Sequence, residues 1–299
     1  MQKILITGGS GLLGSNLAIR LRKKFDVAIL INKRLIKLPG VTTFDREILF
    51  QKDYYNFVPD LIINTVALTD IELCEENPSL AFETNVNFLK SLNLICKEKN
   101  TKLLHISTDH LSDGLSSFCT EDDIIKPLNE YALTKQKAEN YILNEFPNSI
   151  IVRTNFFGWG TKYRKSFSDK IIENIISHKE IFLFVDAFFS PISIRKLSEI
   201  IILLWEQNKS GIFNISSNDR LSKYHFGLKV CDYFNLDKKF IIPSSIDSAK
   251  NLVLRPKDTS LNNKKVSFSL NYDCGFISDS INDLIYDSKD GIKDTLKKL

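Results

Sequence analysis

The sequence predicts an α/β protein with a doubly wound parallel sheet and a smaller C-terminal region. Apolar runs alternate along the chain with segments of helical period, as strands and helices do in this fold class. Three runs, 60–66, 102–107 and 149–154, are almost unbroken, which is typical of parallel strands buried on both faces. The first run of the chain leads straight into a glycine-rich turn and a helix. Together these observations indicate right-handed β-α-β units.

The expected elements follow one another along the 299 residues. We expect strands over residues 3–7, 26–32, 60–66, 102–107, 149–154, 181–185 and 211–216. We expect helices directly after the glycine-rich turn and over residues 79–98, 129–146, 166–178 and 193–207. Length alone favours two structural units, and since no flexible linker separates them, we expect them to be interleaved.

The composition argues against several classes of function. The formal net charge is +4 with acidic and basic residues interspersed, so nothing indicates a nucleic-acid partner. No apolar run approaches the ~18 residues that span a bilayer, and the chain starts in a core strand, so we expect a soluble, unexported protein. Five widely spaced cysteines without a CxxC pair indicate reduced thiols in a cytoplasm and no metal site. They are Cys74, Cys96, Cys119, Cys231 and Cys274.

The turn after the first strand has the pattern of a dinucleotide-binding turn. Its residues, GGSGLLG from 8 to 14, match both GxGxxG and GxxGxxG. Gly8 and Gly11 permit a tight turn whose backbone N–H groups approach a pyrophosphate, and Gly14 lets the next helix pack closely on the strand. The pyrophosphate would lie at the helix N-terminus, where unpaired N–H groups favour an anion. A turn that binds nothing is the alternative, and the strand-turn-helix order argues against it.

This turn makes the predicted fold Rossmann-like. We assign residues 1–155 to a dinucleotide-binding domain, and we expect residues 186–222 to return to it. Residues 156–185 and 223–299 would then form the smaller region, which binds the substrate.

The end of the second expected strand favours NADPH over NADH. A cofactor without a 2′-phosphate usually meets an Asp or Glu about 20 residues after the glycines. This chain has Asn32, Lys33 and Arg34 there, and two cations suit a 2′-phosphate. A solvated basic strand end is the alternative reading, and under it NADH stays open.

Candidate catalytic residues follow the strand expected at 102–107. Thr108 and Asp109 stand at its end, at the carboxyl edge of the sheet where open α/β folds bind ligands. Tyr131 and Lys135 come later in an expected helix, and their i, i+4 spacing puts them on one face. A nearby cation lowers the pKa of a phenol from about 10, so we expect Lys135 to make Tyr131 a proton donor near neutrality. Thr108 would hydrogen-bond the carbonyl being reduced, and Lys135 would also hold the nicotinamide ribose.

Eight segments occur in the order and at the spacings of a known family. They are TGGSGLLG, DLIINTVALTDIELCEENPSLAFETN, ISTD, KPLNEYALTKQKAE, VRTNFFG, DAFFSPISI, GIFNIS and RPKDTSLNNKKV. On these segments the chain resembles the extended short-chain dehydrogenase/reductases, and within them the dTDP-4-dehydrorhamnose reductases. The resemblance covers nearly the whole chain. Thr108, Tyr131 and Lys135 match the catalytic Thr, Tyr and Lys of that family, with Asp109 beside the substrate.

The resemblance also implies contacts along the whole dinucleotide. The pyrophosphate would lie against the glycine-rich turn, at Gly8, Ser10, Gly11, Leu12 and Leu13. The adenosine would lie at Asn32, Asp45 and Arg46. The nicotinamide would face Ala67, Leu68 and Thr69.

Three positions depart from the family pattern. The family commonly has an aromatic residue at the position of His110, a Gly at that of Ala132 and a Trp at that of Phe156. Since Phe156 would touch the sugar, the identity of the substrate stays open. His110 is either an acid/base group or a hydrogen-bonded structural histidine.

Relatives with other chemistry differ at the strand end. Sugar-nucleotide 4,6-dehydratases have the pattern Thr-Asp-Glu there, because their Glu removes a carbon-bound proton. This chain has Thr108, Asp109 and His110 instead. The epimerase-reductases that make fucose nucleotides have a Cys directly after the catalytic Ser, where this chain has Asp109.

The sequence therefore predicts an NADPH-dependent reductase that acts on the 4-keto group of a nucleotide-linked 6-deoxysugar for surface polysaccharides. We expect Arg255 to contact the diphosphate of the substrate, because Arg pairs well with phosphate. One alternative is a sugar-nucleotide epimerase that retains NAD, against which the basic strand end argues. Another is a non-catalytic NADP-binding regulatory subunit, against which Thr108, Tyr131 and Lys135 argue. The sequence leaves the oligomeric state open, with a homodimer among the options.

Overall fold

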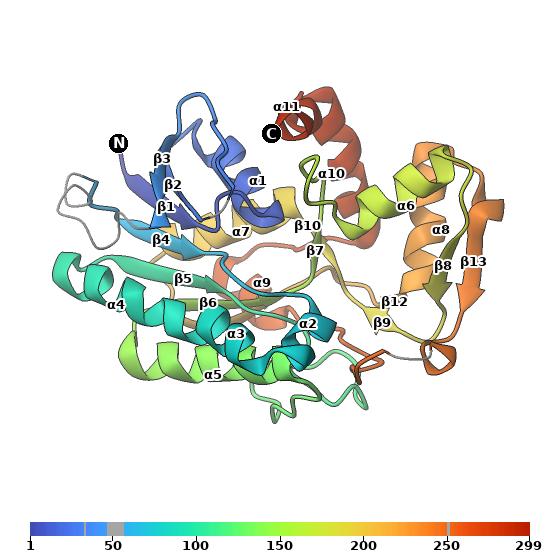
Figure 1. Cartoon of the computed structure of the whole chain (residues 1–299), viewed down its shortest axis with the longest axis horizontal. Helices are drawn as coiled ribbons and strands as arrows, with labels where there is room; N and C mark the ends of the chain where they lie inside the picture. The colour runs from blue at the N-terminus through green and yellow to red at the C-terminus, as the bar shows by residue number, and fades with distance from the viewer. Residues whose placement is uncertain (33, 47–56, 250–251) are drawn as a thin grey trace.

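A seven-stranded parallel sheet forms the centre of the molecule (Figure 1). The computed structural model describes residues 1–32, 34–46, 57–249 and 252–299. The strands stand side by side in the order β11-β6-β5-β4-β1-β2-β3. Their bounds are β1 Lys3–Thr7, β2 Asp26–Ile31, β3 Thr42–Asp45, β4 Leu61–Asn64, β5 Lys102–Ile106, β6 Ile150–Thr154 and β11 Gly211–Ile215. The strand order reverses between β1 and β4, which confirms the doubly wound sheet and puts its ligand-binding crevice at their carboxyl ends.

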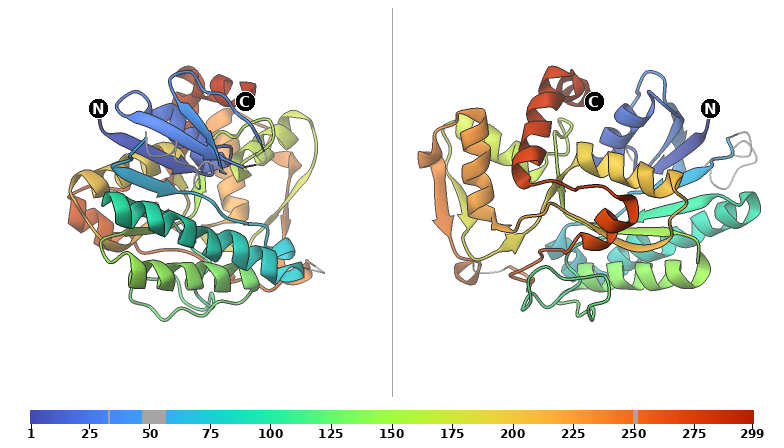
Figure 2. Two further views of the ribbon diagram at one scale, coloured as in Figure 1. Left: turned by 60° about the vertical axis from the view of Figure 1, so that its left-hand side comes forward. Right: turned by 180° about the vertical axis from the view of Figure 1, so that it is seen from behind.

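Helices cover both faces of this sheet (Figure 2). The alternation of side chains along β1 defines the two cores, because Ile4 and Ile6 belong to one apolar cluster and Leu5 to the other. The first cluster is covered by α1 and α7, and the second by α4 and α5. These helices span α1 Leu12–Leu21, α4 Phe88–Lys99, α5 Glu130–Glu145 and α7 Ile194–Glu206.

A smaller lobe lies beside the sheet, at the right in Figure 1. Two helices pack there on a two-stranded sheet, and short strand pairs join the lobe to the rest of the molecule. The lobe contains α6 Phe167–Ile176, β8 Ile181–Phe184, α8 Lys223–Phe234 and β13 Ile241–Ser244. The joining strands are β7 Phe156–Phe157, β9 Phe188–Phe189, β10 Ile192–Ser193 and β12 Leu221–Ser222.

The chain after the lobe returns to the main sheet. Helix α9 (Lys264–Leu270) contacts β11, α10 (Ile277–Lys289) contacts α7, and α11 (Ile292–Lys298) contacts α1. Residues 223–299 thus touch both the lobe and the main sheet, and their assignment to one substrate-binding region stays a prediction. No helix of the described chain is long and apolar enough to cross a membrane.

The strand expected at 181–185 forms as β8 and pairs with β13 in the lobe, where Phe182 is 63% exposed. Two other elements differ from the sequence expectation. The edge strand β3 was not expected, because its four residues are partly exposed and form no apolar run. The helix expected at 79–98 is α3 (Pro78–Phe82), a π-helical turn (Glu83–Asn87) and then α4.

The π-helical turn carries Asn85, whose side chain bonds to the segment after β4 and to helix α5. The Asn85 Oδ1 accepts a hydrogen bond of 2.7 Å from the backbone N–H of Leu68. Its Nδ2 donates to the Leu68 carbonyl at 3.2 Å and to the Thr134 hydroxyl at 2.9 Å. The turn therefore ties the segment after β4 to helix α5. That segment continues into helix α2 (Ile71–Glu76).

Candidate active site

The turn between β1 and α1 forms a cradle of backbone atoms. Gly8 has a φ of +74°, a left-handed conformation that favours glycine. A Cβ on Gly14 would lie 2.3 Å from the carbonyl oxygen of Gly8, so only glycine lets α1 approach the turn this closely. Helix α1 begins directly after Gly11. The N–H groups of its first turn suit the pyrophosphate of a dinucleotide.

A first cavity of about 520 Å³ lies beside this cradle. Seven of the predicted cofactor residues line it: Gly8, Ser10, Gly11, Asn32, Arg34, Arg46 and Ala67. Asp45 and Leu68 are not among the residues that line this cavity or its neighbour. Lys33 lies outside the described residues. The Arg34 guanidinium stacks over the ring of Tyr163, with 4.0 Å between Cζ and the ring centroid.

A second cavity of about 360 Å³ continues from the first along the carboxyl ends of the strands. The predicted residues that line it are Leu12, Leu13, Thr69, Thr108, Asp109, Tyr131, Lys135 and Phe156. Four residues line both cavities: Gly11, Thr65, Ala67 and Arg164. The structure thus brings the predicted catalytic residues to one end of a path that begins at the glycine cradle.

Tyr131 and Thr108 face each other in the second cavity. Asn129 caps helix α5 by accepting a hydrogen bond from the N–H of Ala132, which fixes Tyr131 in the first turn. Burial raises the pKa of Tyr131, and a hydrogen bond with Thr108 opposes the rise. The expectation that Lys135 lowers the pKa of Tyr131 is therefore wrong for this structure, because burial dominates. A raised pKa keeps the phenol protonated at neutral pH.

Lys135 lies one helical turn further along α5 and is fully buried. Its Nζ donates to the carbonyl oxygen of Ile106 at 2.8 Å and lies 3.0 Å from the Nε2 of His105. Burial lowers the pKa of Lys135 to about 8, and the charge of Glu139 opposes this shift. His105 was not predicted to belong to the site, since nothing in the sequence distinguishes it from a core histidine.

Asp109 anchors the polar end of the second cavity. Its Oδ2 accepts a hydrogen bond of 2.9 Å from the Nδ2 of Asn155. The His110 Nε2 lies 3.9 Å from the Asp109 Oδ1, and burial lowers the pKa of His110 despite this carboxylate. The ring of His110 lies edge-on to Tyr131, with 6.0 Å between the centroids. His110 thus borders the reacting groups.

Arg255 lies outside both cavities. Its guanidinium pairs with Glu72 on helix α2 and donates to the carbonyl oxygen of Val253 at 3.1 Å. It lies near enough to His110 to lower the pKa of that imidazole. The predicted contact between Arg255 and the substrate diphosphate stays a prediction.

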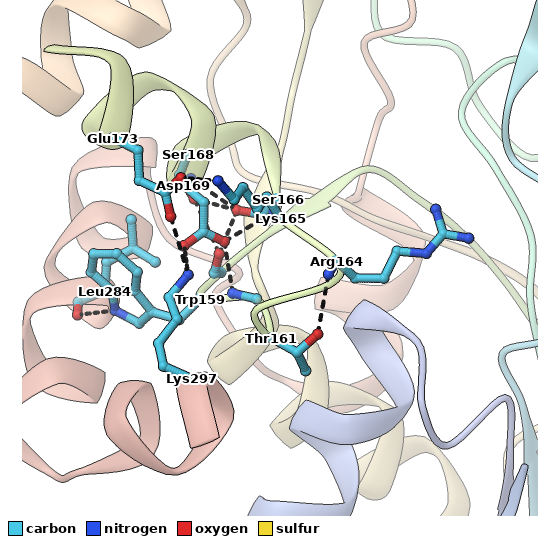
Figure 3. Close-up of polar contacts among 12 residues, drawn as sticks. Trp159, Thr161, Arg164, Lys165, Ser166, Ser168, Asp169, Glu173, Leu284 and Lys297 are labelled. Atoms are coloured by element: carbon cyan, nitrogen blue, oxygen red, sulfur yellow. Dashed lines mark hydrogen bonds and ion pairs between the residues drawn. The ribbon is translucent and has the colours of Figure 1, made fainter. Parts of the chain in front are cut away.

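A loop over residues 158–166 reaches both cavities and was missed from the sequence. Its Tyr163 lines the first cavity, Lys165 lines the second, and Arg164 lines both. Figure 3 shows the Arg164 side chain extending away from the anchor of this loop. The only sequence signal is the cluster of cations in KYRKS, which matches no motif.

Asp169 at the start of α6 holds this loop in place (Figure 3). Its Oδ2 accepts hydrogen bonds from the N–H groups of Gly160 at 2.7 Å and Ser166 at 2.9 Å. Its Oδ1 accepts one of 3.0 Å from Lys297 of helix α11. A Cβ on Gly160 would lie 1.9 Å from the carbonyl oxygen of Arg164, so the loop folds back tightly on itself.

Lys223, at the first position of α8, is a second cation that sequence reasoning missed. Its Nζ lies 3.3 Å from the ring centroid of Phe189. Burial lowers the pKa of Lys223 to about 8, and the charge of Asp109 opposes the shift. In the described parts of the chain, no cluster of three or more His, Cys, Asp or Glu side chains could hold a metal ion.

Comparison with known proteins agrees with this geometry. The family described as RmlD substrate binding domain matches residues 1–285. A dTDP-4-dehydrorhamnose reductase of Aggregatibacter actinomycetemcomitans is 28% identical over 242 residues, which cover 78% of this chain and 79% of that protein. Methionine adenosyltransferase 2 subunit beta of Mus musculus is 25% identical over 274 residues, 89% of this chain and 81% of that protein.

The fold is that of solved reductase structures. The structure of dTDP-4-dehydrorhamnose reductase from Bacillus anthracis in complex with NADP matches with a TM-score of 0.83 at 21% identity. The match covers 96% of this chain and all of that one. This likeness confirms the Rossmann-like arrangement of the main sheet.

Proposed function

Since the chain belongs to the family of the RmlD substrate binding domain, we propose that it is an NADPH-dependent reductase of the 4-keto group of a nucleotide-linked 6-deoxysugar. The observation that carries this proposal is the second cavity, where Thr108, Tyr131 and Lys135 lie together at the end of the path from the glycine cradle. A carbonyl placed there would have the hydroxyls of Thr108 and Tyr131 on one side and the proposed dinucleotide site, the first cavity, on the other.

The residues of the first cavity fit NADPH. The close approach at Gly14 and the left-handed Gly8 leave room for a pyrophosphate at the start of α1. Arg34 is the described cation at the end of β2, where a 2′-phosphate would lie, and NADH is the second candidate. Bound NADPH would supply the hydride for the ketone carbon.

Tyr131 provides the proton in this proposal. Its hydroxyl is protonated at neutral pH because burial raises its pKa. As the ketone oxygen gains negative charge, Tyr131 donates its proton to that oxygen, and the phenolate later recovers a proton from solvent. Thr108 hydrogen-bonds the same oxygen, and Lys135 holds the nicotinamide ribose.

The substrate contacts that we propose lie on the other side of the second cavity. Asp109 and Phe156 would contact the sugar, and Arg255 would contact the diphosphate after its pair with Glu72 opens. Residues 156–185 and 223–299 would provide the substrate-binding region. We place the reaction in the cytoplasm, in the synthesis of sugars for surface polysaccharides. A homodimer is the assembly that we would test first.

An assay of NADPH oxidation tests the proposal. The purified protein is offered a panel of nucleotide-linked 4-keto-6-deoxysugars that differ in base and sugar stereochemistry, with Tyr131→Phe as the control. Oxidation with at least one sugar, lost in the control, supports the proposal. Oxidation with none of them would overturn it.

One similarity supports a second candidate. The chain is similar to methionine adenosyltransferase 2 subunit beta, and the second candidate is therefore a regulatory subunit that binds NADP without reductase activity. Such a subunit would bind NADPH as tightly as an enzyme does, but no sugar of the panel would cause NADPH to be oxidised. An epimerase would instead convert the sugar without net consumption of NADPH.

A further inference from the structure

A ladder of buried polar side chains leads from the centre of the sheet to Lys135. Thr7, Asn64 and His105 occupy neighbouring positions on strands β1, β4 and β5, because Thr7 pairs in register with Asn64 and Asn64 with His105. All three side chains are at most 1% exposed. A buried polar ladder needs every donor to face an acceptor, so its hydrogen bonds can be assigned one by one.

The backbone determines the orientation of Asn64. Its Oδ1 accepts a hydrogen bond of 3.2 Å from the N–H of Val66, and the hydroxyl of Thr7 donates to the same oxygen at 2.6 Å. Reversing the amide would direct its NH₂ group at the N–H of Val66. Because a backbone N–H can only donate, the Nδ2 of Asn64 must be the atom that faces His105.

The orientation of Asn64 in turn determines the tautomer of His105. The Asn64 Nδ2 lies 3.0 Å from the Nδ1 of His105 and can only donate, so Nδ1 has to accept. A neutral imidazole whose Nδ1 accepts has its proton on Nε2. A charged imidazolium also has a proton on Nδ1, and this N–H would face the N–H of Asn64, so neither group could accept. Burial also lowers the pKa of His105 well below its usual value.

The Nε2 proton of His105 points at Lys135. The two nitrogens are 3.0 Å apart, a distance at which one must donate and the other accept. We propose that Asn64 holds the proton of His105 on Nε2, so that Lys135 accepts a hydrogen bond there only in its neutral amine form. The amine has one lone pair for this contact and keeps N–H groups for the Ile106 carbonyl. An ammonium has no lone pair, so protonating Lys135 breaks its contact with His105.

The groups around Lys135 act in opposite directions. His105 on β5 and burial favour the amine, and the pKa of Lys135 is lowered to about 8. Glu139, one turn further along α5, favours the ammonium, although three hydrogen bonds from Arg153 already engage its carboxylate. Tyr131, one turn before, is protonated and uncharged at neutral pH, because burial raises its pKa. His105 is thus a positioning residue that acts through Lys135.

The inference gives a pH dependence that rests on the proposed reductase activity. An ammonium at Lys135 stabilises the Tyr131 phenolate left after proton transfer, whereas an amine does so poorly. Turnover should therefore fall as the pH rises through the pKa of Lys135. Removing the Nε2–H donor should move this fall to higher pH.

The closing experiment does not depend on activity. Nitrogen NMR of the ¹⁵N-histidine-labelled protein reports which ring nitrogen of His105 is protonated, and the loss of one signal in His105→Gln assigns it among the four histidines. We expect a proton on Nε2 and none on Nδ1 at pH 9, where Lys135 is mostly the neutral amine. A proton on Nδ1, or on both nitrogens, would overturn the inference whatever the protein catalyses.

Two variants of the ladder provide a matched pair. Asn64→Asp keeps the shape but puts an acceptor opposite Nδ1, so the proton should move to Nδ1 and the pKa of Lys135 should rise by about one unit or more. Thr7→Val removes one donor to Asn64 Oδ1 and leaves that of Val66, so the Nε2 tautomer should persist. If Asn64→Asp does not fold, the tautomer in the unmodified protein and in Thr7→Val still decides the question. A tautomer that is the same in all three folded proteins would contradict the role of Asn64.

Discussion

The guanidinium of Arg34 stacks on the ring of Tyr163, with 4.0 Å between Cζ and the ring centroid, and joins the chain after β2 to the loop 158–166 at the wall of the first cavity. Arg34 was predicted to bind a 2′-phosphate, and Tyr163 was not predicted to belong to the site. The stack holds the guanidinium at the cavity wall before any ligand binds. A cation that is already positioned loses less conformational entropy on binding.

The first prediction concerns the choice between cofactors. Arg34→Ala should weaken NADPH binding by about 10- to 100-fold, the loss of one charge-assisted hydrogen bond, and leave NADH binding nearly unchanged. Titration of both cofactors by fluorescence measures this. Lys23→Ala removes the same charge beyond the far end of α1 and should change neither affinity. Equal losses for NADPH and NADH in Arg34→Ala would place the 2′-phosphate elsewhere.

The second prediction concerns the loop 158–166. Because Arg164 lines both cavities next to Gly11, it should contact the pyrophosphate that the two cofactors share. Arg164→Ala should therefore weaken NADPH and NADH by a similar factor, about tenfold or more. Lys162→Ala is the matched control, since Lys162 is an exposed cation of the same loop that lines neither cavity. Unchanged affinities in Arg164→Ala would rule out the contact.

The third prediction concerns the proton donor. Tyr131→Phe removes one hydroxyl from the second cavity and should lower kcat by about 10²- to 10⁴-fold, as is typical for the loss of an acid–base group. The Kd for NADPH should stay nearly constant, because the ring is kept. Thr108→Val should also lower kcat, with little change in melting temperature. Unmodified turnover in Tyr131→Phe would make His110, whose ring lies 6.0 Å from that of Tyr131, the next residue to test.

The fourth prediction concerns the ion pair between Glu139 and Arg153. Both side chains are at most 5% exposed, and the Arg153 Nη2 lies 2.8 Å from the Glu139 Oε2, between β6 and α5. Glu139→Gln should lower the free energy of unfolding by roughly 3–5 kcal/mol, since it leaves the charge of Arg153 buried without a counter-charge. Glu145→Gln, in the exposed pair with Lys97, should cost less than about 1 kcal/mol. Urea unfolding at pH 7 measures both, and equal losses would contradict the effect of burial.

The main sheet could be predicted because burial on both faces leaves a clear pattern in the sequence. Strands such as β4 and β5 are continuous apolar runs, and their parallel order follows from the helices between them. Edge strand β3 lacks this pattern, since a partly exposed strand tolerates residues such as those of TTFD. The partner of β8 could not be predicted, because β13 lies nearly sixty residues later and only tertiary packing brings the two together.

The sequence likewise predicts one part of the candidate site and misses another. Spacing predicts that Tyr131 and Lys135 share a helix face, and the structure places both on the second cavity. The prediction of a lowered pKa for Tyr131 was wrong because spacing carries no information on burial, which raises this pKa. His105, Arg164 and Lys223 were missed because their contacts come from elements that are distant in the sequence.

The position of the Asn85 side chain depends on the number of residues in the π-helical turn Glu83–Asn87. An α-helix advances about 100° with each residue, so losing one residue there would restore a regular helix and turn Asn85 away from Leu68. The backbone between Ala67 and Thr69 would then lose the amide that holds it against α5. A one-residue deletion at this point would therefore release the backbone that carries Ala67 and Thr69, two residues that line the second cavity.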